Sequence, residues 1–154
     1  RVSRGLGDVY KRQVLSQAMR SREIHRTYQA FALGETAASG TIDAPIARLN
    51  GSLIQRTVDF ASGERSVTHY RTLAHCSVFS HLELNLETGR THQIRVHMAY
   101  IGHPLLGDTL YNKTPGTFPR QALHSASLSF VHPITGEPLN FHAPLPEDMQ
   151  NLLT

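Results

Sequence analysis

The stretch that decides the fold is Glu87-Thr-Gly-Arg-Thr-His-Gln-Ile-Arg-Val-His97. Residues 79–86, just before it, alternate leucines with polar side chains, as expected of a strand with one solvated face. Residues 91–101 place apolar side chains at helical spacing, and Gly102 follows where a left-handed residue commonly ends a helix. A strand, a glycine turn and a helix in this order leave free backbone N–H groups at the helix start, and such groups can bind a phosphate or a carboxylate.

Upstream of this stretch the pattern predicts one helix and several strands. Residues 14–23 have apolar side chains at helical spacing. Residues 25–34 and 66–73 alternate as strands do, and residues 35–63, rich in Gly, Ser, Thr and Ala, predict a long excursion with short strands. In the first strand, one face carries Tyr28, Ala30 and Ala32, and the other carries Gln29, Phe31 and Leu33.

Downstream, residues 122–131 and 138–141 alternate again, and the Pro-Ile-Thr-Gly between them predicts a hairpin turn. Pro146 and the two acids after it predict a short final helix. Strands that are linked by turns rather than by helices predict an α/β protein of the α+β kind, with a mixed, largely antiparallel sheet and flanking helices.

Residues 1–13, RVSRGLGDVYKRQ, show neither helical nor strand periodicity. We expect them to be disordered or foreign to the protein, and residues 14–154 to form the folded domain. The apolar runs are too short for a transmembrane helix, which needs about 20 apolar residues, and no signal peptide is visible. The single cysteine, Cys76, excludes an intramolecular disulfide and fits a cytoplasmic location.

The charge of the chain gives no support for nucleic-acid binding by itself. The formal net charge is +3, and the cations are almost all arginine, which suits phosphate. However, this excess lies in residues 1–13, and the cations and anions of residues 14–154 are equal in number. Any argument for RNA binding must therefore come from the local placement of arginines.

Two interpretations of Arg90 and Arg95 are equally open from the spacing. In one, both arginines flank the free N–H groups of the helix and form an anion site. In the other, Thr91 caps the helix and the two arginines pair with Glu83 and Glu87 on the surface.

The histidines, Cys76 and Tyr28 give weaker indications of a metal site, a nucleophile or a base-stacking residue. The ten histidines show no metal-ligand spacing: His92 and His97, five residues apart, lie about 140° apart on a helix. We therefore expect no metal site. Cys76 is expected to be buried rather than nucleophilic. Tyr28, between small neighbours, could stack on a base or be a core tyrosine with a satisfied hydroxyl.

Several segments together resemble one family. Residues 86–97 and Ile101-Gly-His-Pro-Leu-Leu-Gly-Asp-Thr-Leu-Tyr111 closely resemble the RluA-type RNA pseudouridine synthases. His25-Arg-Thr-Tyr-Gln-Ala upstream and Gln121-Ala-Leu-His-Ser downstream fit the same pattern, as does His132-Pro-Ile-Thr-Gly-Glu-Pro-Leu. The resemblance runs from about residue 14 to the C-terminus.

The resemblance implies the pseudouridine synthase catalytic fold, here incomplete at its N-terminus, with a cleft for a flipped-out uridine. It implies isomerisation of uridine to pseudouridine in rRNA or tRNA, with no metal, no organic cofactor and no membrane, by a monomer. Tyr28 matches the tyrosine that packs on the base and can take the C5 proton. Arg95 matches the arginine that pairs with the catalytic Asp, Ile94 an apolar pocket wall, and Arg90, His92 and Gln93 supporting or RNA-contacting residues.

One element of the family pattern is missing from the 154 residues. The family's catalytic Asp stands in an Arg-Leu-Asp-x-x-Thr-Ser-Gly motif, and this motif does not occur here. Asp8, Asp43 and Asp108 do not match it. Because the reaction depends on that carboxylate, we expect a truncated chain that is inactive and poorly soluble. The alternatives are an RNA-binding domain that kept the fold without catalysis and an anion-binding metabolic enzyme.

Overall fold

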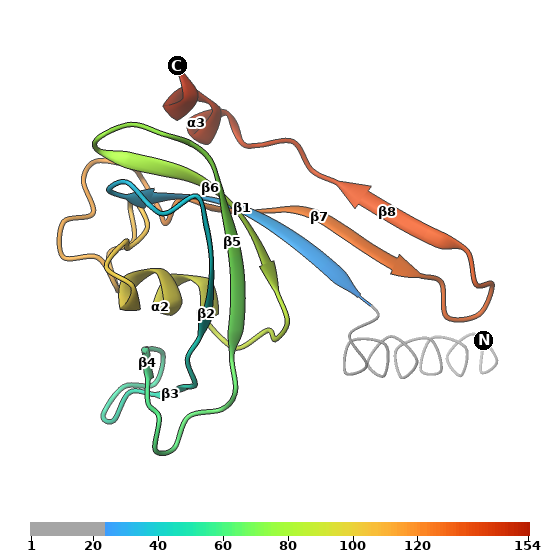
Figure 1. Ribbon diagram of the computed structural model, residues 1–154, viewed down its shortest axis with the longest axis horizontal. Coiled ribbons are helices and arrows are strands. Elements are labelled where there is room, and N and C mark those ends of the chain that lie inside the picture. Colours follow the sequence, from blue (N-terminus) through green and yellow to red (C-terminus); the bar gives the residue numbers. More distant parts are fainter. Residues whose placement is uncertain (1–23) are drawn as a thin grey trace.

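A computed structural model of the chain describes residues 24–154. The segment 1–13 and the helix predicted at 14–23 lie outside the described residues, so both stay predictions. Six strands form one sheet in the order β2-β5-β6-β1-β7-β8, and β3 and β4 form a separate hairpin (Figure 1). The strands are β1 (His25–Leu33), β2 (Ser39–Asp43), β3 (Ile46–Arg48), β4 (Arg56–Val58), β5 (Val67–His75), β6 (Phe79–Leu86), β7 (Leu123–Val131) and β8 (Pro138–His142).

Every strand pair within residues 24–154 is antiparallel. The helices are α2 (Gln93–Tyr100), α3 (Glu147–Gln150) and a 3-10 turn, η1 (Asn151–Leu153). The predicted α+β fold with a largely antiparallel sheet is therefore confirmed. No helix in the described part of the chain is long and apolar enough to span a bilayer.

The alternation of β1 divides the core between the two faces of the sheet. On one face, Ala30 and Ala32 pack with Leu82 and Leu84 of β6 and with Met98 of α2. On the other face, Phe31 is buried against residues from the loop after α2 and from α3, namely Leu106, Ala122 and Met149. Each helix thus covers one face, as the sequence alternation predicted.

Helix α2 begins later than predicted, and Thr91 does not cap it. Its N-cap is His92, which has a left-handed backbone (φ 57°) and makes no side-chain cap hydrogen bond. At the other end, Gly102 has the left-handed conformation expected for a helix terminator, with φ 87°. The chain therefore enters α2 through a strained residue and leaves it through a relaxed one.

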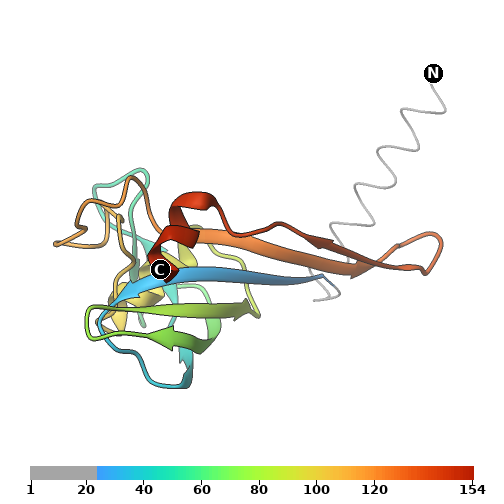
Figure 2. The ribbon, with the colours of Figure 1, turned by 90° about the horizontal axis from the view of Figure 1, so that it is seen from above.

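The β7–β8 hairpin projects from the body of the molecule, as both ribbon views show (Figures 1 and 2). β8 is one edge of the sheet. Val131, Ile134 and Phe141 are more than half exposed along this hairpin. The far end of the hairpin therefore carries apolar surface beside a strand edge to which no other strand of residues 24–154 pairs.

Cys76 is exposed, which corrects the expectation that it is buried. The expectation assumed that Cys76 lies within a strand, but β5 ends at His75. Cys76 instead lies in the turn to β6, where its backbone N–H donates to the carbonyl oxygen of Phe79 at 2.9 Å. A turn residue has no buried face to occupy.

Candidate functional site

Tyr28 lines a cavity of about 220 Å³ between β1 and the end of β6. Its floor and walls come from the first residues of β1 and from the turn that leads to α2. The described residues that line it are Ile24, His25, Arg26, Tyr28, Leu86, Glu87, Thr88 and Gly89. The cavity therefore joins the predicted stacking residue to the stretch that decides the fold.

A break in the pairing of β1 lies beside Tyr28. The register of β1 against β7 shifts between Thr27, which pairs with Ser127, and Tyr28, which pairs with Ser125. Such β-bulges bend a strand and redirect side chains, and they are common next to active sites. The bulge therefore lies beside the Tyr28 cavity, on the side of β1 that pairs with β7.

The Tyr28 ring is anchored, but its hydroxyl is not. The half-buried ring packs on the α2 face of the core, beside the group that includes Ile94. Within residues 24–154 the Tyr28 hydroxyl makes no hydrogen bond. A core tyrosine normally satisfies its hydroxyl, so this one is free to contact a ligand in the cavity.

Arg95 holds a buried carboxylate, that of Asp108. Nε and Nη2 of Arg95 donate to the two oxygens of Asp108 at 2.9 Å each. The backbone N–H groups of Leu110 and Tyr111 also donate to Asp108, whose side chain is fully buried. Burial raises the pKa of this carboxyl, but the hydrogen bonds from Arg95 and the backbone outweigh it, so the pKa is lowered. The same pair raises the pKa of Arg95.

Tyr111 connects Arg95 to His92. The Arg95 guanidinium lies 5.2 Å from the centre of the Tyr111 ring, and the Tyr111 hydroxyl lies 2.7 Å from Nδ1 of His92. That hydroxyl also accepts from the backbone N–H of Arg56 at 2.9 Å, which ties the β3–β4 hairpin to α2. Burial, followed by the charges of Arg95 and Arg56, lowers the pKa of His92. The Tyr111 hydroxyl therefore donates a hydrogen bond to Nδ1 of neutral His92.

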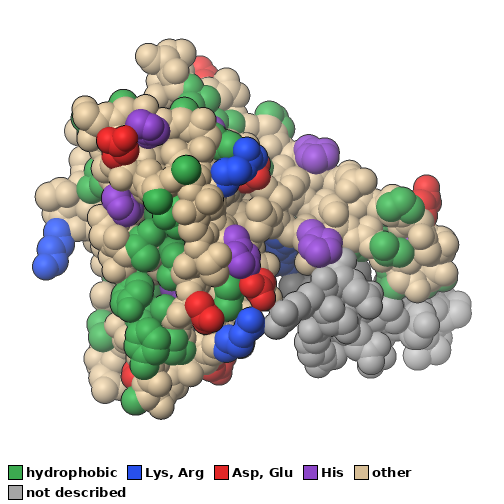
Figure 3. All heavy atoms as spheres, in the orientation of Figure 1, with side chains coloured by type: hydrophobic (Ala, Val, Ile, Leu, Met, Phe, Trp, Pro, Cys, Tyr) green, Lys and Arg blue, Asp and Glu red, His purple; other side chains and the backbone are tan. Residues whose placement is uncertain are grey.

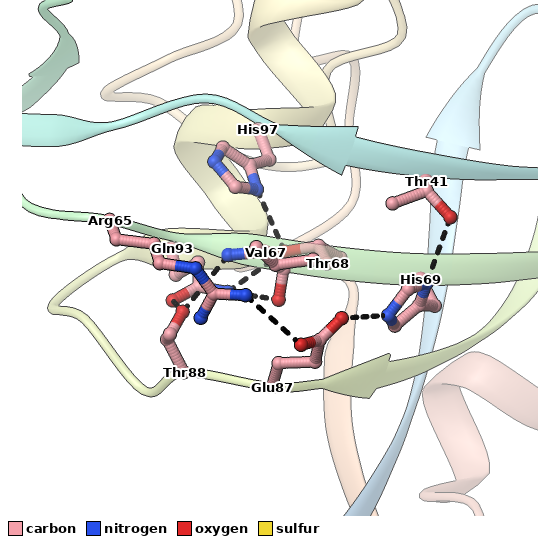
Figure 4. A network of polar contacts seen from close by, with 9 residues as sticks. All are labelled: Thr41, Arg65, Val67, Thr68, His69, Glu87, Thr88, Gln93 and His97. Atoms are coloured by element: carbon pink, nitrogen blue, oxygen red, sulfur yellow. Dashed lines mark hydrogen bonds and ion pairs between the residues drawn. The ribbon is translucent and has the colours of Figure 1, made fainter.

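Gln93 has a structural role in a buried chain of hydrogen bonds (Figure 4). Its Nε2 donates to Oγ1 of Thr68 at 3.0 Å, and Thr68 lies 2.7 Å from Nδ1 of His97. Nε2 of His97 donates to the carbonyl of Ala44 at 2.8 Å. Because burial lowers the pKa of His97, the ring is neutral and Nδ1 accepts from Thr68. On its other side, Gln93 accepts from Thr88 and from the backbone of Arg90.

Arg90 and Arg95 do not pair with Glu83 and Glu87, which corrects that interpretation of the spacing. Arg90 pairs with Glu64 at 2.9 Å and donates to the carbonyl of Arg65. Glu83 pairs with Arg71. Glu87 contacts His69 at 2.6 Å and Arg65 at 3.2 Å, and these hydrogen bonds lower its pKa. The acidic partners, Glu64 and Asp108, come from connecting segments that the local spacing could not reveal.

The predicted site residues fall into separate groups. Tyr28 faces the cavity and Ile94 lies in the core next to it, only 4% exposed. Arg95 and His92 belong to the Tyr111 cluster, and Arg95 is not among the described residues that line the Tyr28 cavity. Arg90 lines a second cavity, which touches the first at Gly89.

The histidines are dispersed rather than gathered at one point, as Figure 3 shows for one face. Within residues 24–154 no three His, Cys, Asp or Glu side chains are placed to hold a metal. His69, His75 and His81 have separate partners, namely Glu87, Glu35 and Gln29. The regular six-residue spacing of these histidines therefore reflects no common site.

Two residues of the site were not predicted from sequence reasoning, namely Asp108 and Tyr111. Both stand in the Gly-Asp-Thr-Leu-Tyr part of the run that carried the family resemblance. A buried Asp next to a glycine gives no periodic signal, because its partner Arg95 lies 13 residues upstream. Only the resemblance of this run to the family motif indicated that the segment belongs to the site.

Comparison with known proteins shows which family the chain is similar to. The family model described as RNA pseudouridylate synthase matches residues 11–100. The chain is 49% identical over 145 residues to the uncharacterized RNA pseudouridine synthase YjbO of Bacillus subtilis, covering 94% of this chain and 51% of that protein. It is 47% identical to ribosomal large subunit pseudouridine synthase D of Vibrio cholerae, covering 88% and 46%.

Solved structures show the same likeness. Human RNA pseudouridylate synthase domain containing 1 superimposes with a TM-score of 0.73 at 26% identity, over 84% of this chain and 58% of that chain. The chain spans about half the length of the curated relatives that it matches.

Proposed function

Because the chain belongs to the RluA-type RNA pseudouridylate synthase family, we propose that it provides the base-holding part of an enzyme that converts uridine to pseudouridine in rRNA or tRNA. In this isomerisation the N1–C1′ bond breaks, the base turns, and a C5–C1′ bond forms. N1 gains a proton and C5 loses one. A target within folded RNA must first leave its stack.

The observation that carries the proposal is the hydroxyl of Tyr28 in its cavity, which has no hydrogen-bond partner among residues 24–154. The ring is fixed from below by the core, so a base can stack on it at little cost in conformational entropy. The hydroxyl is then available to the proton at C5. Ile94 supports the ring from the core, and Gln93 holds the turn that forms the cavity wall.

The catalytic carboxylate is the part that these residues do not provide. Asp108 is fully buried and accepts four hydrogen bonds, three of them at Oδ1, so a sugar or a base cannot reach its carboxylate. In our proposal Asp108 fixes the orientation of Arg95, whose side chain is 14% exposed. Arg95 can then direct a remaining N–H toward a second carboxylate.

A chimera tests this proposal. Residues 14–154 are joined to the part of the Bacillus subtilis relative that lies outside the match, which by the resemblance supplies the Arg-Leu-Asp motif. RNA transcripts labelled with tritium at uridine C5 should release tritium to water when the chimera is added. The matched control is the same chimera with that Asp changed to Asn. A folded chimera that binds RNA and releases no tritium would contradict the proposal.

The second function is RNA binding without catalysis, and the missing motif favours it for the 154 residues alone. Under this alternative the chain binds RNA in a salt-dependent manner and never modifies it. We also propose that the protein acts in the cytoplasm, as a monomer, and without a metal or an organic cofactor.

A further inference from the structure

A second cavity, of about 450 Å³, lies between the β3–β4 hairpin and the turn before α2. Three arginines line it, and Glu64 is the one acidic side chain among its described lining residues. Gly89 borders both this cavity and the Tyr28 cavity. A side chain at Gly89 would meet nothing within 4 Å, so no neighbouring atom crowds this shared border.

Two of these arginines stand directly opposite each other. Arg48 of β3 pairs with Arg56 of β4 in the antiparallel register. Like charges at opposed positions destabilise a strand pair, and within residues 24–154 neither arginine has a carboxylate partner. This unfavourable arrangement is held in place by other contacts, including the bond from the Arg56 backbone to Tyr111.

The third arginine approaches from the opposite wall. Arg90 is held toward the cavity by its contacts with Glu64 and with the carbonyl of Arg65. The Glu64 side chain is 70% exposed, so water weakens this ion pair. Arg90 can therefore leave Glu64 and bind a phosphate instead, at a small cost in free energy.

From this geometry we infer that Arg48, Arg56 and Arg90 form a phosphodiester-binding site, which holds the RNA backbone next to the nucleotide in the Tyr28 cavity. The inference rests on the proposed function and adds to it how the RNA is positioned. A phosphate between Arg48 and Arg56 converts their repulsion into attraction, and arginine offers a fork that matches phosphate oxygens. The border at Gly89 lets one strand occupy both cavities.

The test measures binding of a fluorescent uridine-containing RNA stem-loop to the 154-residue chain at several salt concentrations. Each phosphate contact contributes about 0.7 to 0.9 to the slope of log K against log [salt]. The double variant R48Q/R56Q should lower this slope by about one, since the two arginines share one phosphate, and weaken binding at low salt. Glu64→Gln should strengthen binding, because it removes the anion that competes for Arg90.

Arg71→Gln is the matched control. It removes one exposed arginine, which pairs with Glu83 outside the cavity, and it should change the slope little. The melting temperature of R48Q/R56Q should equal or exceed that of the unchanged chain, since the opposed charges are gone. If R48Q/R56Q binds weakly because it is unfolded, the affinity of Glu64→Gln provides the test instead. An affinity that does not rise in Glu64→Gln then contradicts the site.

The outcomes separate this inference from the proposed function. An unchanged salt slope in R48Q/R56Q overturns the phosphate site, whether or not the chimera releases tritium. A reduced slope with an inactive chimera supports the site and contradicts the uridine chemistry. Arg71→Gln removes one charge and R48Q/R56Q removes two, so a loss of slope in Arg71→Gln of half or more of that in R48Q/R56Q would mean that only overall charge matters, which also overturns the site.

Discussion

The guanidinium of Arg95 donates hydrogen bonds to both carboxylate oxygens of Asp108, which lies in the loop after α2. The carboxylate is fully buried and the arginine side chain nearly so. The helix and the loop are thereby fixed to each other through a pair that has little access to water. Because Tyr111 stacks beside Arg95 and bonds to His92, this pair also orients the start of α2.

Arg95→Ala should destabilise the fold by about 3 to 5 kcal/mol, because it leaves the buried Asp108 charge unpaired. Urea denaturation followed by circular dichroism measures this change. Arg71→Ala, which breaks an exposed pair with Glu83, should cost about 0 to 1 kcal/mol. Equal losses in the two variants would show that the Arg95 pair is no more than a surface contact.

Tyr28→Phe should leave RNA binding by the chimera nearly unchanged and slow tritium release by about 100-fold or more. The ring that stacks on the base remains, while the hydroxyl proposed to take the C5 proton is lost. Tyr100→Phe is the control, since that exposed tyrosine lies outside the cavity. Full activity in Tyr28→Phe would exclude the hydroxyl from proton transfer.

Stability should fall as the pH drops below about 6.5, partly because of His97. Burial lowers the pKa of this histidine in the folded chain, so between the unfolded and folded pKa only the unfolded chain binds the proton. The contribution of neutral His97 to the free energy of unfolding is fully present above the pKa that this histidine has in the unfolded chain. As the pH falls below that value, the contribution decreases by up to about 1.4 kcal/mol per pH unit. His97→Gln should flatten the dependence of melting temperature on pH between 6.5 and the folded pKa, as calorimetry would show; an unchanged slope contradicts the assignment.

The exposed side chains of the β7–β8 hairpin should make the isolated chain prone to aggregation. Hydrophobic side chains show at the far end of this hairpin (Figure 3), and within residues 24–154 β8 is an edge strand with a partner on one side only. Replacing Val131 and Phe141 by Thr should raise the soluble concentration and reduce binding of an apolar dye. The same replacements at Leu53 and Phe60, exposed in other segments, serve as the control. An equal rise in soluble concentration from both sets of replacements would show that the hairpin contributes no more to aggregation than other exposed apolar side chains.

The sequence predicted the fold well where the periodicity of apolar side chains, or a short turn motif, determines the structure. The alternation in residues 25–34 assigned both faces of β1, and residues 79–86 coincide with β6. The hairpin near the C-terminus and the glycine after α2 were also predicted correctly, because turn chemistry is local.

The errors arose where contacts join residues far apart in the chain. The partners of Arg90 and Arg95 are Glu64 and Asp108, and neither is set by helical spacing. The left-handed His92 displaced the start of α2, and no residue type signals such strain in advance. The anion cavity was equally hidden, because the opposed Arg48 and Arg56 are brought together only by the register of a short hairpin.

Release of tritium from uridine C5 by the 154-residue chain itself, with RNA binding measured in the same samples, tests most directly whether catalysis depends on the missing carboxylate. This dependence predicts salt-dependent binding and no release above the buffer level, because the base-holding cavity is present and the motif carboxylate is not. Release of tritium by this chain alone would contradict it, because some other group would then provide the catalysis assigned to that missing carboxylate.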